Sequence, residues 1–177
     1  AMICGIVGRY QRQLRHILEV LPLDPGVSAP AAMTAVQNDR GTWFFVDTHV
    51  QYDPTVEQIA EATMQAVLRL KLFGITPKVA LLSHSNFGSH DNPSACKMRR
   101  VLALVREQAP SLEIDGEMQA DTALNEEIRE NIFPNSLLSG RANVFVFPNL
   151  DAANIAYNIV RSMTDGVAIG PILMGVS

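Results

Sequence analysis

The sequence predicts an α/β fold: a three-layer α/β/α sandwich around a mostly parallel sheet, with one antiparallel hairpin added. Two observations support this. Short apolar runs of strand length alternate with amphipathic helical patterns over most of the 177 residues, as they do in βαβ units. The run Val79–Leu82 is apolar at every position and lies between Pro77 and the polar stretch 83–89, which is typical of a strand buried on both faces of a sheet.

Composition excludes several classes of function. The chain is 47% hydrophobic, its formal net charge is −4, and its longest basic run is the Arg99-Arg100 pair. A nucleic-acid binder needs a basic patch, so we expect no such partner. Cys4 and Cys96 lie far apart, with neither a zinc-binding spacing nor a disulfide framework, which favours a reducing cytoplasm and predicts no metal site. No membrane span or signal peptide is visible, so we expect no membrane partner.

Both ends of the chain predict that it belongs to a longer polypeptide. Residues 1–5 read as if they were already inside a strand, and residues 170–177 are an apolar segment with no helix after it.

The first third predicts a strand, a helix and a hairpin. An apolar run ends at Gly8 and is followed by apolar residues at helical spacing from Leu14. After a proline-rich connector, residues 32–37 and 42–46 flank the turn sequence Asn-Asp-Arg-Gly, which indicates a β-hairpin. His49 follows the second strand, where it serves either as a hydrogen-bonded loop residue or as a base.

Two helices surround the central strand. The first is expected to begin at Asp53, its N-cap, with Pro54 in the first turn, and to end at Gly74. Its apolar stripe is rich in small residues, so it packs either beneath the sheet or across a dimer contact. The second is expected to begin at Asp91 or Ser94 and to end before Pro110.

The last third adds further strands and helices. Residues 112–119 alternate as a short strand, 121–132 predict a polar acidic helix, and 142–147 a buried strand. A helix then begins with Asn149 or Asp151 as its N-cap, and a final apolar strand follows the glycines at 166 and 170.

Polar residues follow the central strand where ligands settle in open α/β sheets. They supply hydroxyl, amide and backbone donors that suit a phosphate or a carbonyl oxygen, and the candidates are Ser83, Ser85, Asn86, Gly88 and Ser89. The same residue types also form turns and helix caps. Asp115 and Glu117 are expected near the same crevice, where a carboxylate pair binds magnesium, acts as acid and base, or fixes a turn.

Several segments resemble, in order and spacing, the phosphate acetyl/butyryltransferase family: residues 79–89, 115–121, 140–144, 147–150, 154–157 and 168–173. The resemblance implies the two-domain α/β/α arrangement shared with isocitrate and isopropylmalate dehydrogenases. By that comparison residues 1–30 form the edge of the first subdomain and a connector. Residues 31–168 form the second subdomain, and residues 169–177 return toward the first.

Departures from the family pattern point away from acyl transfer. In phosphotransacetylases a Ser-Arg motif follows the final strand, and this chain stops at Ser177. The usual Thr-Lys-Gly after the central strand is Asn86-Phe87-Gly88 here, and a Thr-Thr near the start of the first helix is Arg9-Tyr10. The chain is most similar to the phosphotransacetylase-like C-terminal region of bacterial hybrid NADP-dependent malic enzymes, in which this region is understood to bind acetyl-CoA as a regulator.

This resemblance implies a regulatory, homo-oligomer-forming domain that binds acetyl-CoA or a related acyl-CoA. An N-terminal malic enzyme domain of the same chain would oxidatively decarboxylate malate with NADP and Mg or Mn. The ligand would contact the residues of the 83–89 loop named above and Asn154, Tyr157, Gly170 and Pro171, with no catalytic residue in this chain. Two alternatives stay open: a fragment of an active phosphate acetyltransferase, and a domain that only assembles the oligomer.

Overall fold

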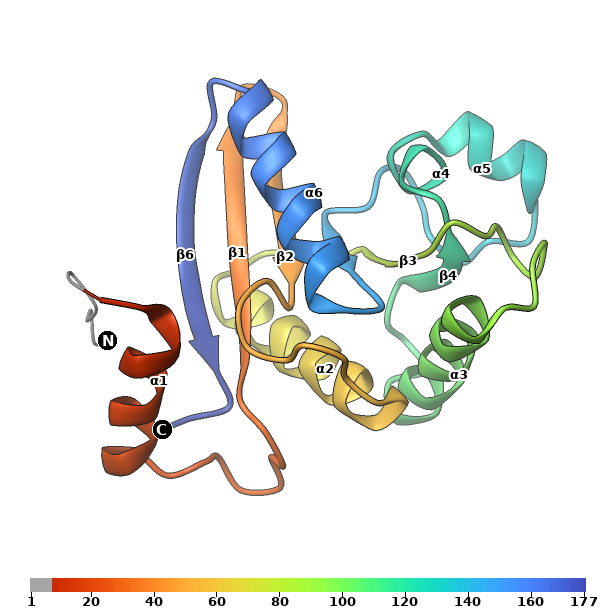
Figure 1. Ribbon diagram of the computed structural model, residues 1–177. Helices are drawn as coiled ribbons and strands as arrows, with labels where there is room; N and C mark the ends of the chain where they lie inside the picture. The colour runs from red at the N-terminus through yellow and green to blue at the C-terminus, as the bar shows by residue number, and fades with distance from the viewer. Residues whose placement is uncertain (1–7) are drawn as a thin grey trace.

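In the computed structural model, which describes residues 8–177, six strands form one sheet in the order β4-β3-β5-β2-β1-β6 (Figure 1). The strand expected ahead of Gly8 lies outside the described residues. The strands are β1 (Ala31–Asn38), β2 (Gly41–Val46), β3 (Val79–Leu82), β4 (Ile114–Met118), β5 (Val144–Val146) and β6 (Val167–Met174). The helices are α1 (Tyr10–Val20), α2 (Val56–Leu72), α3 (Pro93–Gln108), α4 (Ala120–Leu124), α5 (Glu126–Ile132) and α6 (Leu150–Met163).

The sheet is mostly parallel, as predicted. β3 pairs in parallel with β4 and β5, and β5 pairs in parallel with β2. The predicted hairpin is also confirmed, because β1 and β2 are antiparallel from Met33 opposite Val46 to Asn38 opposite Gly41. In the turn, the Asn38 side chain accepts a hydrogen bond from the Arg40 backbone N–H at 2.8 Å. β6 adds a second antiparallel pairing, along the other side of β1.

Helices cover both faces of the sheet. α2 and α3 pack together over one face, where their apolar stripes meet the side chains of β1, β2, β3 and β5 in the larger core cluster. α4 and α6 contribute to a second cluster on the other face, which is rich in aromatic residues. The small residues of α2 therefore serve packing beneath the sheet. No helix among residues 8–177 is long and apolar enough to cross a membrane.

The start of α2 differs from the prediction. Thr55, not Asp53, is the N-cap: its side chain accepts from the Gln58 backbone N–H at 3.3 Å, and the Gln58 side chain accepts from the Thr55 N–H at 2.9 Å. This reciprocal capping box satisfies two N–H groups at once.

Two other helix boundaries also differ from the expected ones. α3 begins after Asn92, whose side chain caps the Ala95 N–H and which lies between the two residues proposed. The acidic helix expected at 121–132 is two helices, because Asn125 adopts an extended conformation and caps α5 through the N–H groups of Glu127 and Ile128. Asn149 caps α6, which was one of the two alternatives.

Candidate functional site

The loop that follows β3 folds around one buried carboxylate. Glu117, at the end of β4, is fully buried, and its Oε1 atom accepts hydrogen bonds from Ser85 Oγ at 2.7 Å and Gly88 N at 2.9 Å. Arg99 on α3 donates to the same oxygen from Nη1 at 2.9 Å. The parallel pairing of β3 with β4 brings the two strand ends together, so a sequence-distant acid becomes the centre of the loop.

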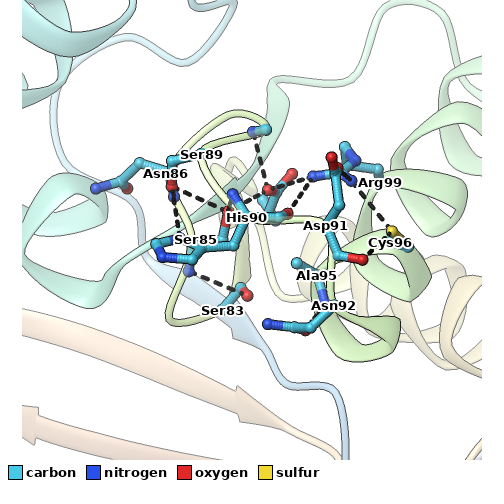
Figure 2. A network of polar contacts seen from close by, with 12 residues as sticks. Ser83, Ser85, Asn86, Ser89, His90, Asp91, Asn92, Ala95, Cys96 and Arg99 are labelled. Atoms are coloured by element: carbon cyan, nitrogen blue, oxygen red, sulfur yellow. Dashed lines mark hydrogen bonds and ion pairs between the residues drawn. The ribbon is translucent and has the colours of Figure 1, made fainter.

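Further hydrogen bonds link the loop to itself and to its surroundings (Figure 2). Ser89 Oγ accepts from the Asn86 N–H at 3.0 Å, and Ser85 Oγ accepts from the His90 N–H at 3.1 Å. The Phe87 N–H donates to the Glu117 carbonyl oxygen at 2.7 Å. Ser85, Asn86 and Ser89 are among the residues that the sequence predicted to contact a phosphate or carbonyl ligand. In this structure they hold the loop closed.

Arg99 joins the loop to helix α3. Its Nη1 also donates to the His90 carbonyl at 3.0 Å, and its Nη2 donates to Asp91 Oδ1 at 2.6 Å and to Cys96 Sγ at 3.1 Å (Figure 2). Desolvation opposes the charged form, but the charge of Glu117 and the hydrogen bond to it raise the pKa of Arg99 above its ordinary value. The sequence alone does not reveal this role of Arg99, because nothing in its spacing points to a buried acid on another strand.

Asp115 does not share the crevice with Glu117, contrary to expectation. Its Oδ1 accepts from Arg106 Nη2 at 2.9 Å and from the Gly116 N–H at 3.0 Å, and its Oδ2 accepts from Ser136 Oγ at 2.8 Å and the Leu137 N–H at 2.9 Å. Asp115 therefore fixes the loop before β5. No group of three or more metal-binding side chains occurs among residues 8–177.

Gly116 separates the two acids. Its φ of 142° lies in the region that favours glycine, and a Cβ there would come within 2.6 Å of the Leu81 carbonyl oxygen. The pairing of β3 with β4 also shifts register after Leu81. A regular strand would place Asp115 and Glu117 on one face, and this irregularity sends them to different partners.

A second polar cluster follows β2. Thr34 Oγ1 and Thr48 Oγ1 lie 2.7 Å apart, and Thr48 Oγ1 lies 2.7 Å from His49 Nδ1. Burial lowers the pKa of His49, so the ring is neutral near pH 7 and hydrogen-bonded, as in one of the two alternatives for this residue. Asp47 accepts backbone bonds from three following residues, and burial raises its pKa.

The remaining candidate residues are spread over the sheet. Asn154 on α6 donates to the Thr48 carbonyl at 3.3 Å, so it belongs with the cluster after β2. Tyr157 is 7% exposed and packs edge-on against Phe45, with ring centroids 5.9 Å apart. Gly170 and Pro171 lie on β6, four strand spacings from β3, which is about 19 Å at the usual separation of strands. The structure thus joins Asn154 to the loop after β2, but does not gather all the candidates into one pocket.

Comparison with known proteins matches the whole chain to one family. The family model for phosphate acetyl/butaryl transferase matches residues 1–177. The NAD-dependent malic enzyme of Rhizobium meliloti is 50% identical over 175 residues, which are 99% of this chain and 23% of that protein. The NADP-dependent malic enzyme of Escherichia coli is 50% identical over 178 residues, which are 100% of this chain and 24% of that protein.

Phosphate acetyltransferases are similar as well. That of Paracoccus denitrificans is 44% identical over 180 residues, covering 98% of this chain and 57% of that protein. The crystal structure of a phosphotransacetylase from Streptococcus pyogenes superposes with a TM-score of 0.91 at 32% identity, covering 98% of this chain and 53% of that one. The chain spans about a quarter of the malic enzymes that it matches. It belongs to the phosphate acetyl/butaryl transferase family.

Proposed function

We propose that this chain is the regulatory and oligomer-forming region of a malic enzyme, and that acetyl-CoA or a related acyl-CoA is its effector. The observation that carries the proposal is the match to malic enzymes: they are 50% identical to essentially the whole chain, and the match occupies only their C-terminal part. The remainder of such a protein would decarboxylate malate oxidatively to pyruvate in the cytoplasm. NADP and Mg or Mn would serve that remainder, although one similar malic enzyme is NAD-dependent.

The arrangement of the loop after β3 supports binding rather than acyl transfer. Acetyl phosphate carries negative charge, and the centre of the loop already holds the carboxylate of Glu117, with Ser85 and Gly88 bonded to it. Arg99 balances the charge of Glu117, but a phosphoryl group there would find the Ser85 hydroxyl and the Gly88 N–H already bonded to that carboxylate. An effector would instead contact the rim of the loop, where Ser83 and Asn86 are partly exposed.

Regulation also requires two states that differ in affinity for the effector, since tight binding alone shifts no equilibrium. A homo-oligomer supplies such states through its interfaces. The effector would bias the malic enzyme active site by stabilising one of them.

Malate oxidation by the full-length protein tests this proposal. We expect acetyl-CoA to change the rate of malate-dependent NADP or NAD reduction, and Asn86→Ala to raise the acetyl-CoA concentration at half effect. Gln108→Ala, which removes an exposed amide side chain at the end of α3, is the control and should leave that concentration unchanged. A rate of malate oxidation that does not change at any acetyl-CoA concentration would contradict the regulatory role.

An active phosphate acetyltransferase is the second candidate. It is favoured by the 44% identity to the Paracoccus denitrificans enzyme and by the superposition on the Streptococcus pyogenes phosphotransacetylase. Formation of acetyl-CoA from acetyl phosphate and CoA by the full-length protein at an enzyme-like rate would establish it. We expect no such activity.

A further inference from the structure

A groove of about 550 Å³ on the aromatic face of the sheet is lined by residues of α6 and of the α4–α5 pair. Alternate residues of two neighbouring strands form its floor: Trp43 and Phe45 on β2, and Phe145 and Phe147 at β5. Its volume falls in the range of small-molecule sites, which are mostly apolar with a few polar groups.

Two arginines lie at one end of this groove. β2 and β5 are parallel with Phe44 opposite Val144, and the same register carried backward places Gly41 beside Arg141. Arg40 and Arg141 therefore flank the amino-terminal ends of neighbouring strands, and both line the groove. Both are exposed, and neither takes part in an ion pair within residues 8–177.

The lining of the groove extends from Arg141, three residues before β5, to Phe147, which follows it. Aliphatic side chains wall it on both sides, Leu124 and Ile128 from the α4–α5 pair and Ala156 and Val160 from α6. The floor and walls offer apolar surface to a ligand, with Arg40 and Arg141 at one end and the acid Asp121 among the residues contributed by α4.

We propose that this groove binds an amphipathic anion, a linear apolar chain that ends in a carboxylate. The chain would lie on the aromatic floor, and Arg40 and Arg141 would hold the carboxylate through charge-assisted hydrogen bonds. None of the residues of the loop after β3 lines the groove, so the site is separate from the one assigned to acetyl-CoA and does not depend on it.

Trp43 makes the test direct, because it is the only tryptophan of the chain and lines the groove. Titration of the 177-residue chain with dodecanoate, below the concentration at which it forms micelles, should change Trp43 emission in a saturable way. Dodecanol, which has the same chain without the charge, should bind at least about tenfold more weakly, as expected for loss of hydrogen bonds to a charged group.

Three variants separate this site from general adsorption to apolar surface. Arg40→Gln with Arg141→Gln should weaken dodecanoate binding by about tenfold or more and leave dodecanol binding unchanged. Ala156→Leu narrows the groove and should weaken both. Leu72→Ala, which alters an exposed apolar residue at the end of α2, should change neither.

Equal affinities for dodecanoate and dodecanol, or a double arginine variant that binds dodecanoate normally, would overturn the proposal. Self-association of the chain in sedimentation would also overturn it, if Trp43 emission shifts with protein concentration and does not respond to dodecanoate. A second copy of the chain would then cover Trp43.

Discussion

The carboxylate of Glu117 lies 2.9 Å from the guanidinium of Arg99 while its side chain is fully buried. Removing one partner of a buried ion pair leaves the other uncompensated and is costly, although Arg99 keeps 30% of its side chain exposed and can be partly rehydrated. The pair therefore holds the loop after β3 against the sheet more than it stabilises the whole fold.

Glu117→Gln should lower the free energy of unfolding by about 1–3 kcal/mol, because the amide keeps the shape but loses the charge that Arg99 faces. Urea unfolding would measure the change. Glu107→Gln, an exposed acid on α3, is the control and should stay within about 0.5 kcal/mol of the parent. A Glu117→Gln protein as stable as its parent would show that the buried pair contributes nothing.

Asp115→Asn should also destabilise the protein, by about 2–3 kcal/mol, because one carboxamide oxygen cannot replace the four hydrogen bonds that both carboxylate oxygens accept. Acetyl-CoA binding should be unaffected at a temperature where the variant is folded, since Asp115 holds the loop before β5. Thermal unfolding followed by calorimetry of the folded variant checks both statements. If the variant lost effector binding but kept its stability, Asp115 would instead belong to the effector site.

Thr55→Ala should cost about 1 kcal/mol by removing the capping box of α2. Asp53→Ala is the matched comparison, because Asp53 is exposed and its ion pair with Lys97 at 2.9 Å lies at the surface; we expect less than about 1 kcal/mol. Chemical denaturation of both variants decides between the two caps. A larger loss from Asp53→Ala would favour the cap that the sequence had suggested.

Stability should fall in mild acid because of His49. Burial holds the pKa of His49 in the folded protein below its usual value of 6.5, so the unfolded chain binds the proton first as the pH drops. The contribution of His49 to stability is therefore present above about pH 6.5 and is lost as the pH falls toward the folded-state pKa.

Unfolding free energies measured between pH 5 and pH 7.5 should show this slope, and His49→Gln should reduce it. His16→Gln, on the exposed face of α1, is the control. If the unfolding free energy of His49→Gln depended on pH as steeply as that of the parent, other groups would be the cause.

Much of the fold could be read from the sequence because local signals and tertiary demands agreed. Val79–Leu82 is buried at all four positions, as an unbroken apolar run implies. The turn at Asp39-Arg40 joins two antiparallel strands, which confirms the predicted hairpin. The start of α2 was missed because Asp-Pro and Thr-x-x-Gln are both start signals, and only the geometry shows which cap forms.

The candidate site was harder to predict because it depends on sheet order and on one irregularity. Strand spacing in the sequence does not reveal that β3 and β6 are separated by three other strands, so Gly170 and Pro171 could not be placed away from Ser85. Gly116 interrupts the alternation that would have put Asp115 beside Glu117. Arg40 and Arg141 line the same end of the groove only because β2 and β5 are neighbours.

Calorimetric titration of the full-length protein with acetyl-CoA tests the central proposal most directly. We expect a saturable heat of binding, with an affinity that Asn86→Ala lowers and Gln108→Ala leaves unchanged. The absence of any heat of binding across a range of temperatures, from a protein that is folded and assembled, would contradict the account and leave this chain with a purely structural role.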